Sequence, residues 1–370
     1  MPLPAFHTNS WLLPLSWLYG AATAIRNWLF DKGHLRSVSF EEKVPVICVG
    51  NISAGGTGKT PHVEYLVRML QEEGIHPVGV LSRGYKRRSK GFQLAEPVST
   101  AAQLGDEPYQ IYRKFRNAVV AVCESRVEGI RQLLALPVPP AVIILDDAMQ
   151  HRWVQPGFTI CLTSYYRILY KDCMLPAGRL RELQDNVRRA NVVIVSKCPP
   201  ALRKEEETEI TGNMPTTFEQ PIYFSQFEYE GLVNLSTLQP QDVDPKSNVL
   251  MVCGIADPSS MEEYIQTHYR LLDKMLFSDH HNFSSSDIDE IRHRMETIVD
   301  DGLNPDTGLK SVVITTEKDA MRLMRHPAVD DELKSRIYFQ PARIAFISKE
   351  QETRFKNQIL NYVRKNQKKR

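Results

Sequence analysis

The sequence predicts an α/β protein with a mostly parallel sheet and a second, smaller α/β domain. Short apolar runs rich in β-branched residues alternate with helical patterns, as at residues 44–50 and 61–73. Apolar strands that alternate with helices are typical of a parallel sheet covered on both faces. A length of 370 residues exceeds that of one ordinary domain, so we expect a second one.

Strand-like apolar runs set the boundaries of these domains. In the first domain they fall at residues 44–50, 77–82, 118–122, 141–145, 159–163 and 191–195. An acidic and then Pro/Thr-rich stretch breaks the pattern near 200–230, and further runs lie at 222–227, 248–253, 311–316 and 336–345. The predicted parts are an apolar N-terminal helix at 1–36, the first domain at 37–220, the second at 221–364 and a frayed basic tail at 365–370.

The composition is that of a folded protein with no bias toward nucleic acid. Hydrophobic residues make up 42% and charged residues 24%, and 46 Lys and Arg against 44 Asp and Glu leave a net charge of +2. A dedicated nucleic-acid binder usually has a strongly basic domain, so we expect no nucleic-acid partner. The six cysteines form no C-x-x-C pair, which favours reduced thiols over a zinc site. We expect a monomer.

The first thirty residues are apolar enough to suggest a membrane. No Asp, Glu, Lys or Arg precedes Arg26, and the stretch 11–30 has the length that spans a bilayer. Small or polar residues recur at helical spacing and mark a stripe along one face: Ser16, Gly20, Thr23 and Asn27. Trp residues elsewhere on the helix favour the headgroup level, so we expect a membrane-associating helix that lies on the lipid surface or enters it shallowly.

Two other arrangements of this helix remain open. One is a helix that packs on the domain without lipid contact. The other is a helix that crosses the bilayer, in which case Arg26, Lys32 and Arg36 on its C-terminal side would leave the body of the protein in the cytoplasm.

A glycine-rich turn between the strand at 44–50 and the following helix is the strongest local signal. Gly58-Lys59-Thr60 fits the end of the P-loop pattern G-x-x-x-x-G-K-[ST], with Ser53 in place of its first glycine. The N–H groups of such a loop cradle phosphate oxygens at a helix N-terminus, and its lysine neutralises the β- and γ-phosphates. The predicted nucleotide-binding residues are Ser53, Ala54, Gly55, Gly56, Thr57, Gly58, Lys59 and Thr60.

Two carboxylates follow the buried strand that ends at Leu145. Asp146 and Asp147 would lie on the ligand side of an open parallel sheet, where a Walker B aspartate holds Mg²⁺. Adjacent carboxylates repel each other unless a cation lies nearby. The sequence therefore predicts a P-loop NTPase-like fold that binds ATP, with Mg²⁺ held by Thr60, Asp146 and Asp147. A turn-forming Asp pair without metal is the alternative.

Seven segments, in order along the chain, resemble the tetraacyldisaccharide 4′-kinase (lipid A 4′-kinase) family. One departure is visible, because Ala148-Met149 replaces the Gly-Phe that usually follows the two aspartates. The segments are Val49-Gly50-Asn51-Ile52 leading into the P-loop, Leu81-Ser82-Arg83-Gly84-Tyr85, Gly105-Asp106-Glu107-Pro108, residues 146–152, residues 175–182, Asp279-His280-His281-Asn282-Phe283 and residues 315–320.

The resemblance implies a kinase that transfers the γ-phosphate of ATP to the 4′-hydroxyl of an acylated glucosamine disaccharide 1-phosphate and makes lipid IVA. The family acts with Mg²⁺ at the cytoplasmic face of the bacterial inner membrane, and its N-terminal segment associates with the lipid surface. Asp106 and either His280 or His281 resemble its catalytic Asp and His, and Lys59 joins them. Residues that resemble its acceptor contacts are Tyr85, Gln150, Arg181 and Glu182.

The residues themselves agree with this implication and leave one rival. A carboxylate beside a histidine can accept a hydroxyl proton while the imidazole tunes its pKa. Asp106 and the two histidines belong to different predicted domains, so we expect the active site in the cleft between those domains. The rival is a membrane-attached P-loop NTPase switch that acts on protein partners, although Ala54 stands where partitioning ATPases carry a lysine.

Overall fold

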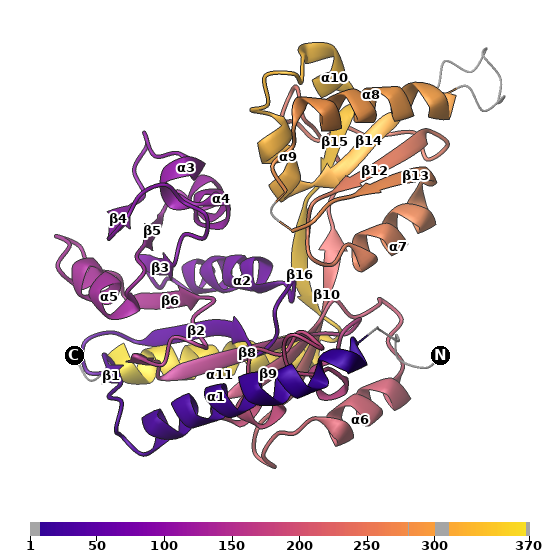
Figure 1. Ribbon diagram of the computed structural model, residues 1–370. Helices are drawn as coiled ribbons and strands as arrows, with labels where there is room; N and C mark the ends of the chain where they lie inside the picture. Colours follow the sequence, from indigo (N-terminus) through magenta and orange to yellow (C-terminus); the bar gives the residue numbers. More distant parts are fainter. Residues whose placement is uncertain (1–7, 280, 300–310, 368–370) are drawn as a thin grey trace. The chain divides into compact units, whose positions relative to one another are not determined.

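The chain forms two compact α/β units, in agreement with the predicted fold class (Figure 1). The computed structural model describes residues 8–279, 281–299 and 311–367. The first unit holds the chain up to Gln226 together with the chain from Ile344 onward, and the second holds Phe227–Arg343. These bounds differ from the predicted domains because the C-terminal residues return to the first unit.

A nine-stranded sheet forms the centre of the first unit, in the order β16-β10-β9-β8-β2-β6-β3-β5-β4. Strands from β10 to β5 run parallel to their neighbours, and β4 pairs antiparallel with β5, so the predicted mostly parallel sheet is confirmed. The strands are β2 (Val46–Asn51), β3 (Val78–Ser82), β4 (Gln93–Leu94), β5 (Ala118–Val122), β6 (Val142–Asp146), β8 (Phe158–Ser164), β9 (Val192–Ser196), β10 (Ile222–Tyr229) and β16 (Ala342–Phe346). Outside this sheet, β1 (Val38–Ser39) pairs parallel with β7 (Val154–Gln155).

Helices cover both faces of this sheet. On one face α2 (Lys59–Glu72), α4 (Asp106–Lys114) and α11 (Lys349–Gln367) bury their apolar side chains in one cluster. On the other face α5 (Arg126–Leu134) and α6 (Lys204–Asn213) pack together with the chain between β8 and β9. The central strands are buried on both sides, which explains their continuous apolar runs. Short helical turns complete the unit: η1 (Ser10–Leu12), α3 (Ala101–Leu104), η2 (Leu169–Lys171) and η3 (Gln184–Arg189).

The last helix, α11, packs in the first unit although the sequence pattern places it in the second domain. Phe355, Ile359 and Val363 of this helix are buried in the same cluster as α2. The hydroxyl of Tyr362 donates to the backbone carbonyl of Val46 at 3.1 Å, at the start of β2. An amphipathic helix packs where its apolar stripe is buried. That surface can belong to a domain whose other residues lie far away in the sequence.

The second unit is a smaller sheet of five strands in the order β11-β15-β14-β12-β13. All its strands run parallel except β11, which pairs antiparallel with β15. Its strands are β11 (Val233–Asn234), β12 (Asn248–Cys253), β13 (Arg270–Leu276), β14 (Val312–Thr316) and β15 (Ile337–Gln340). Its helices are α7 (Ser259–His268), α8 (Ser285–Val299), α9 (Glu317–Leu323) and α10 (Asp331–Arg336).

The N-terminal helix α1 (Leu13–Asp31), drawn in indigo in Figure 1, packs on the first unit with its polar stripe inward. Ser16 and Asn27 are 2% and 4% exposed, whereas Trp17 and Leu18 are 72% and 70% exposed. This is the reverse of an ordinary amphipathic surface helix, whose apolar face is buried. None of the helices within the described residues has the length and hydropathy needed to cross a membrane.

Candidate active site

The turn predicted to be a P-loop, called the P-loop below, joins β2 to α2. β2 ends at Asn51, residues 52–58 form the turn, and α2 begins at Lys59. Gly58 has a φ of 76°, in the left-handed region that residues with a Cβ rarely adopt. Asn51 Nδ2 donates to Thr57 Oγ1 at 2.8 Å, which holds the turn from within. The first N–H groups of a helix have no partners inside the helix, so the turn ends at donors that suit an anion.

Asp146 ends β6, directly beside the strand that leads into the P-loop. β6 pairs parallel with β2, in a register that sets Asp146 opposite Val49. Carboxyl ends of parallel strands lie at one edge of a sheet, so Asp146 and Asp147 lie next to the P-loop. A Cβ placed on Gly50 would approach the Cβ of Met149 to 2.6 Å. The residue that departs from the family pattern therefore packs tightly against the P-loop strand.

Asp147 lies between two cations. Lys59 Nζ is 3.6 Å from Asp147 Oδ1, and Arg181 Nη1 is 3.7 Å from Asp147 Oδ2. Burial opposes ionisation of this carboxyl, but the charges of Lys59, Arg181 and Arg126 outweigh it and hold the pKa of Asp147 below its ordinary value. Asp147 also has a φ of 47°, an uncommon conformation for a residue with a side chain. An ionised carboxylate thus holds two cationic side chains at this end of the sheet.

The neighbouring Asp146 carboxyl is almost fully buried and has no hydrogen-bond partner on either oxygen among the described residues. Burial raises the pKa of Asp146, the charges of Glu107 and Asp147 raise it further, and the result is about 7 despite Lys59 and Arg126. A buried carboxylate without a partner is costly unless a cation lies beside it. Asp146 therefore fits a divalent cation, which prefers oxygen ligands.

This pKa predicts an unusual pH dependence of stability for the protein without metal. The unfolded-state pKa is near 3.8, so between about pH 4 and 7 the folded state holds an extra proton and the free energy of unfolding falls as pH rises. We expect Asp146→Asn to raise the melting temperature at about pH 8 and to change it little at about pH 5, because asparagine mimics the protonated carboxyl. Thermal melts in a chelator measure both.

The control for these melts is Asp172→Asn. Asp172 is equally buried but is held by Arg167 Nε at 2.7 Å, so this variant should be destabilised at both pH values. An Asp146→Asn variant that melts below the wild type at high pH would contradict the burial of an uncompensated charge.

Gln150 and Arg181 come together at the same edge from distant parts of the chain. Arg181 Nη1 donates to Gln150 Oε1 at 3.5 Å, and Gln150 Nε2 donates to the carbonyl of Asn51 at 2.6 Å. The backbone N–H of Arg181 donates to the carbonyl of Ile52 at 2.7 Å. Two of the four predicted acceptor contacts therefore lie beside the P-loop.

The other two predicted acceptor contacts have different surroundings. Glu182 is 1% exposed, and its Oε2 accepts a hydrogen bond from Asn27 and pairs with Arg189. Tyr85 follows β3, is 61% exposed, and its ring centre lies 5.8 Å from Lys86 Nζ. Both remain predicted acceptor contacts, and the structure joins Glu182 to α1.

The predicted catalytic acid–base residues occupy the two units. Asp106 begins α4 in the first unit, directly after Gly105, which has a φ of 91°. In the second unit His281 Nε2 lies 2.9 Å from Asp287 Oδ2, and the imidazole stacks on Phe277 with ring centres 4.4 Å apart. His280 lies outside the described residues. His281 is thus a histidine whose ring is held on two sides.

Sequence reasoning assigned no role to two charged residues that act on Asp146. Arg126 is 2% exposed and its Nη2 lies 3.4 Å from the carbonyl of Asp146, while the charge of Glu107 raises the pKa of Asp146. Arg126 follows Ser125, whose side chain caps α5 just beyond the carboxyl end of β5. The position of Arg126 shortly after a parallel strand could have indicated its role, because polar residues there lie on the ligand side of a sheet.

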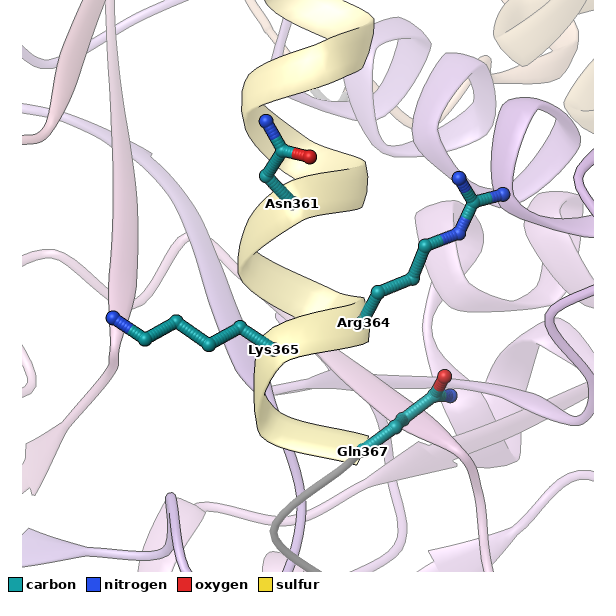
Figure 2. Close-up of a pocket in the computed structure, with 4 residues that line it drawn as sticks. All are labelled: Asn361, Arg364, Lys365 and Gln367. Carbon is teal, nitrogen blue, oxygen red and sulfur yellow. The ribbon is translucent and has the colours of Figure 1, made fainter.

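A surface hollow of about 540 Å³ lies elsewhere on the first unit, lined by Asn361, Arg364, Lys365 and Gln367 of α11 (Figure 2). Arg364 pairs with Glu73 at 2.9 Å, and Glu73 follows the C-terminal end of α2. Lys59 begins α2, and a helix of 14 residues is ~21 Å long. The hollow therefore lies at the far end of this helix from the P-loop.

Comparison with known protein families identifies the family to which this chain belongs. A family model described as tetraacyldisaccharide-1-P 4′-kinase matches residues 8–364. The chain belongs to this family. The resemblance drawn from the seven sequence segments is confirmed, and the matched span includes α1, the P-loop, the Asp146-Asp147 pair and the second unit.

Curated relatives and a solved structure of the tetraacyldisaccharide 4′-kinase family match almost the full length of this chain. The protein named tetraacyldisaccharide 4′-kinase from Bacteroides thetaiotaomicron is 44% identical, with 97% of this chain and 94% of that protein covered. The protein of the same name from Flavobacterium johnsoniae is 43% identical, with 96% and 97% covered. The crystal structure of LpxK from Aquifex aeolicus in complex with ATP is 29% identical, with a TM-score of 0.68 over 96% of this chain and 99% of that chain.

Proposed function

We propose that this protein is a tetraacyldisaccharide 4′-kinase, which transfers the γ-phosphate of ATP to the 4′-hydroxyl of tetraacyldisaccharide 1-phosphate and forms lipid IVA in lipid A biosynthesis. Membership of the kinase family along almost the full chain is the observation that carries this function. The cationic group of Lys59 and Arg181 beside the P-loop supports it, because both substrates carry phosphate.

The nucleotide end of the site is assigned to the P-loop. Its backbone N–H groups would cradle the phosphates, and the Lys59 ammonium would neutralise charge on the β- and γ-phosphates. Thr60 and the two aspartates would hold Mg²⁺, which when bound neutralises the phosphate oxygens. The unpartnered carboxylate of Asp146 supports this ligand set. Mg²⁺ is usually bound by only a few protein ligands, because water molecules and phosphate oxygens of the substrate fill its other coordination positions.

The acceptor end of the site is assigned to Asp106, with Gln150 and Arg181 as its binding residues. Asp106 would accept the proton of the 4′-hydroxyl as that oxygen attacks the γ-phosphorus, and His280 or His281 would tune its basicity. Arg181 offers a planar fork of donors that suits an anionic oxygen, and its contact with Gln150 places an amide beside that fork. Tyr85 and Glu182 complete the proposed acceptor contacts.

The activity is tested with purified protein, γ-labelled ATP, Mg²⁺ and detergent-dispersed acylated disaccharide 1-phosphate. The kinase function predicts that label moves onto the lipid, in a product separated by thin-layer chromatography. A P-loop switch would instead release labelled inorganic phosphate, faster with a protein partner, and would leave the lipid unlabelled. Phosphate release without lipid product would therefore contradict the proposed function.

We further propose that α1 rests on the lipid surface at the cytoplasmic face of the bacterial inner membrane. Its outward side carries the exposed side chains of Trp17 and Leu18, with Trp11 of the preceding turn 79% exposed. Exposed Trp and Leu on a helix that is held by its polar side suit the interfacial region of a bilayer. A kinase whose acceptor is a lipid has a direct need for such a surface.

Replacing outward residues of α1 by polar ones should release the protein from lipid. We expect the double variant Trp17→Ser, Leu18→Ser to shift from the vesicle pellet to the supernatant in a sedimentation assay with vesicles of mixed neutral and anionic phospholipid. Each buried apolar side chain contributes about 1.5–3 kcal/mol to such binding, so the pair should weaken partitioning by a factor of ~100 or more.

The matched control is the double variant Val98→Ser, Val138→Ser. These valines are 81% and 65% exposed but lie outside α1, so their loss should leave partitioning unchanged. Equal sedimentation of the α1 variant and the wild type would contradict the lipid contact.

A further inference from the structure

The inward side of α1 is fixed to one particular segment of the chain, residues 172–182, here termed the bridging segment. Ser16 Oγ donates to the carbonyl of Met174 at 2.9 Å and accepts from the N–H of Ala177 at 3.0 Å. Ser16 is 2% exposed, so water cannot replace these bonds freely. One hydroxyl of the helix therefore holds two backbone groups of the bridging segment.

The C-terminal half of α1 holds the end of the same segment. Asn27 Nδ2 donates to Glu182 Oε2 at 3.1 Å, and both side chains are buried. Arg152 Nη1 donates to the carbonyl of Asn27 at 2.9 Å, and Arg26 donates to the carbonyl of Gln150. The helix thus contacts both chain segments that supply the predicted acceptor contacts at this edge of the sheet.

The bridging segment in turn pairs with the beginning of the P-loop. Ala54 N donates to the carbonyl of Arg179 at 2.6 Å, and Arg181 N donates to the carbonyl of Ile52 at 2.7 Å. Ser53 forms an antiparallel bridge with Leu180 between these two bonds. A continuous set of hydrogen bonds therefore runs from Ser16, along the bridging segment, to the P-loop and to the backbone of Arg181.

We propose that Ser16 is a positioning residue for the acceptor: it fixes the bridging segment so that the Arg181 guanidinium is held beside Gln150 and Asp147. This inference rests on the proposed kinase function and deepens it, because it assigns α1 a second role apart from lipid contact. The inward hydroxyl of Ser16 arranges the acceptor contacts, and the outward side chains meet the lipid.

Loss of the Ser16 hydroxyl should raise the KM for the acceptor disaccharide more than the KM for ATP. The P-loop has supports of its own, since Ser196 Oγ donates to the carbonyl of Thr57 at 2.9 Å and Asn51 Nδ2 donates to Thr57 Oγ1. Within the part of the chain that the structure describes, the side chain of Arg181 makes only long polar contacts, with Nη1 3.5 Å from Gln150 Oε1 and 3.7 Å from Asp147 Oδ2. The position of the Arg181 guanidinium therefore depends more on the backbone of the bridging segment than on contacts of the side chain.

The test compares Ser16→Ala with Thr23→Ala in the full chain, with detergent-dispersed acylated disaccharide and Mg-ATP. Thr23 lies in the same polar stripe, but its hydroxyl donates to the carbonyl of Gly20 in its own helix at 2.9 Å. We expect Ser16→Ala to raise the KM for the disaccharide roughly five- to tenfold, the usual cost of leaving a buried polar group unpartnered. The KM for ATP should change less than about twofold, and Thr23→Ala should match the wild type.

Two further measurements separate positioning from general damage. Ser16→Cys keeps the size of the side chain with a weaker donor and acceptor, so its KM for the disaccharide should lie between those of the wild type and Ser16→Ala. It also provides the test if Ser16→Ala folds poorly. Sedimentation with phospholipid vesicles should be unchanged for all three variants, because the outward side chains are intact.

A Ser16→Ala enzyme with a lower active fraction but an unchanged KM for the disaccharide would show a merely structural role and overturn the inference. Equal effects on the KM values of ATP and disaccharide would also overturn it. If the wild type itself labels no lipid, the proposed function fails and the inference falls with it. A fully active wild type with a normal Ser16→Cys KM contradicts the inference alone.

Discussion

Replacing Asp106 by asparagine should lower kcat by a factor of about 10²–10⁴, because removing a general base in a proton transfer costs that much. Asparagine keeps the size of the side chain and cannot accept the hydroxyl proton. Binding of ATP should persist, since the P-loop is formed by residues 52–58 and the start of α2. Steady-state label transfer measures kcat, and calorimetric titration with ATP measures the retained binding.

The control for Asp106 is Glu128→Gln. Glu128 is also a carboxylate in the first turn of a helix, α5, so this variant reports the loss of a charge at a helix N-terminus without the proposed chemistry. Full activity of Asp106→Asn would show that another group accepts the proton.

The same assay tests the proposal that His280 or His281 acts together with Asp106. His280→Ala and His281→Ala are each combined with Asp106→Asn, because residues that act as one unit lose little more together than apart. A histidine whose loss adds nothing in the Asp106→Asn background would act as one unit with Asp106, and additive losses for both would contradict the proposal. For His281 the hydrogen bond to Asp287 adds a further readout, since Asp287→Asn removes the carboxylate that holds the ring and should then lower kcat.

Replacing Lys59 by alanine should have the second large effect. We expect kcat/KM for ATP to fall by about 10²–10³, the usual loss when one preorganised donor to developing charge is removed. The ATP dissociation constant should rise as well, because in the proposed site Lys59 would also neutralise phosphate charge in the ground state. Titration calorimetry with a non-hydrolysable ATP analogue separates the binding loss from the catalytic loss.

Lys114→Ala is the matched control for Lys59. Lys114 Nζ lies 2.8 Å from a carboxylate oxygen of Glu64 on α2, so this variant also breaks a lysine–carboxylate pair in the first unit. An equal loss of activity in both variants would mean that ion-pair disruption, and not phosphate contact, explains the result.

The first sheet could be predicted because its strands are buried on both faces. Runs such as residues 141–145 contain almost no polar residue, and Val142–Asp146 forms the strand next to the P-loop. β13 was missed for the opposite reason, because Arg270–Leu276 lies at the sheet edge, is exposed at alternate positions and is interrupted by charged residues such as Arg270 and Lys274. The predicted run at 336–345 is two strands in two sheets, separated at Pro341, and apolar periodicity does not reveal such a division.

The acidic stretch after residue 200 was interpreted as a break in the pattern and is the helix α6. Arg203 and Glu206 pair at its start, so the charges that suggested a linker instead hold the first turn. Charge density alone does not separate an exposed helix from a loop, because both can be solvated.

The arrangement beside the P-loop was predictable in part. Parallel strand ends lie at one edge of a sheet, which brings Asp146 next to the P-loop, as expected from the sequence. The contact of Arg181 with Gln150 depends on the path of an irregular segment, which no periodicity encodes. The inward polar stripe of α1 was visible as a spacing, but its partner, the backbone at Met174 and Ala177, was not.

The return of the chain to the first unit imposes an order of events during translation. The second unit is inserted between β10 and β16, and the cluster beneath α2 includes Phe355 and Ile359 near the C-terminus. When residue 343 has been added, the nascent chain contains all of the second unit. It still lacks α11, which completes the helical cover on one face of the first sheet. On the ribosome, the first unit therefore keeps part of one apolar face unshielded until α11 has been synthesised, while the second unit can fold beforehand.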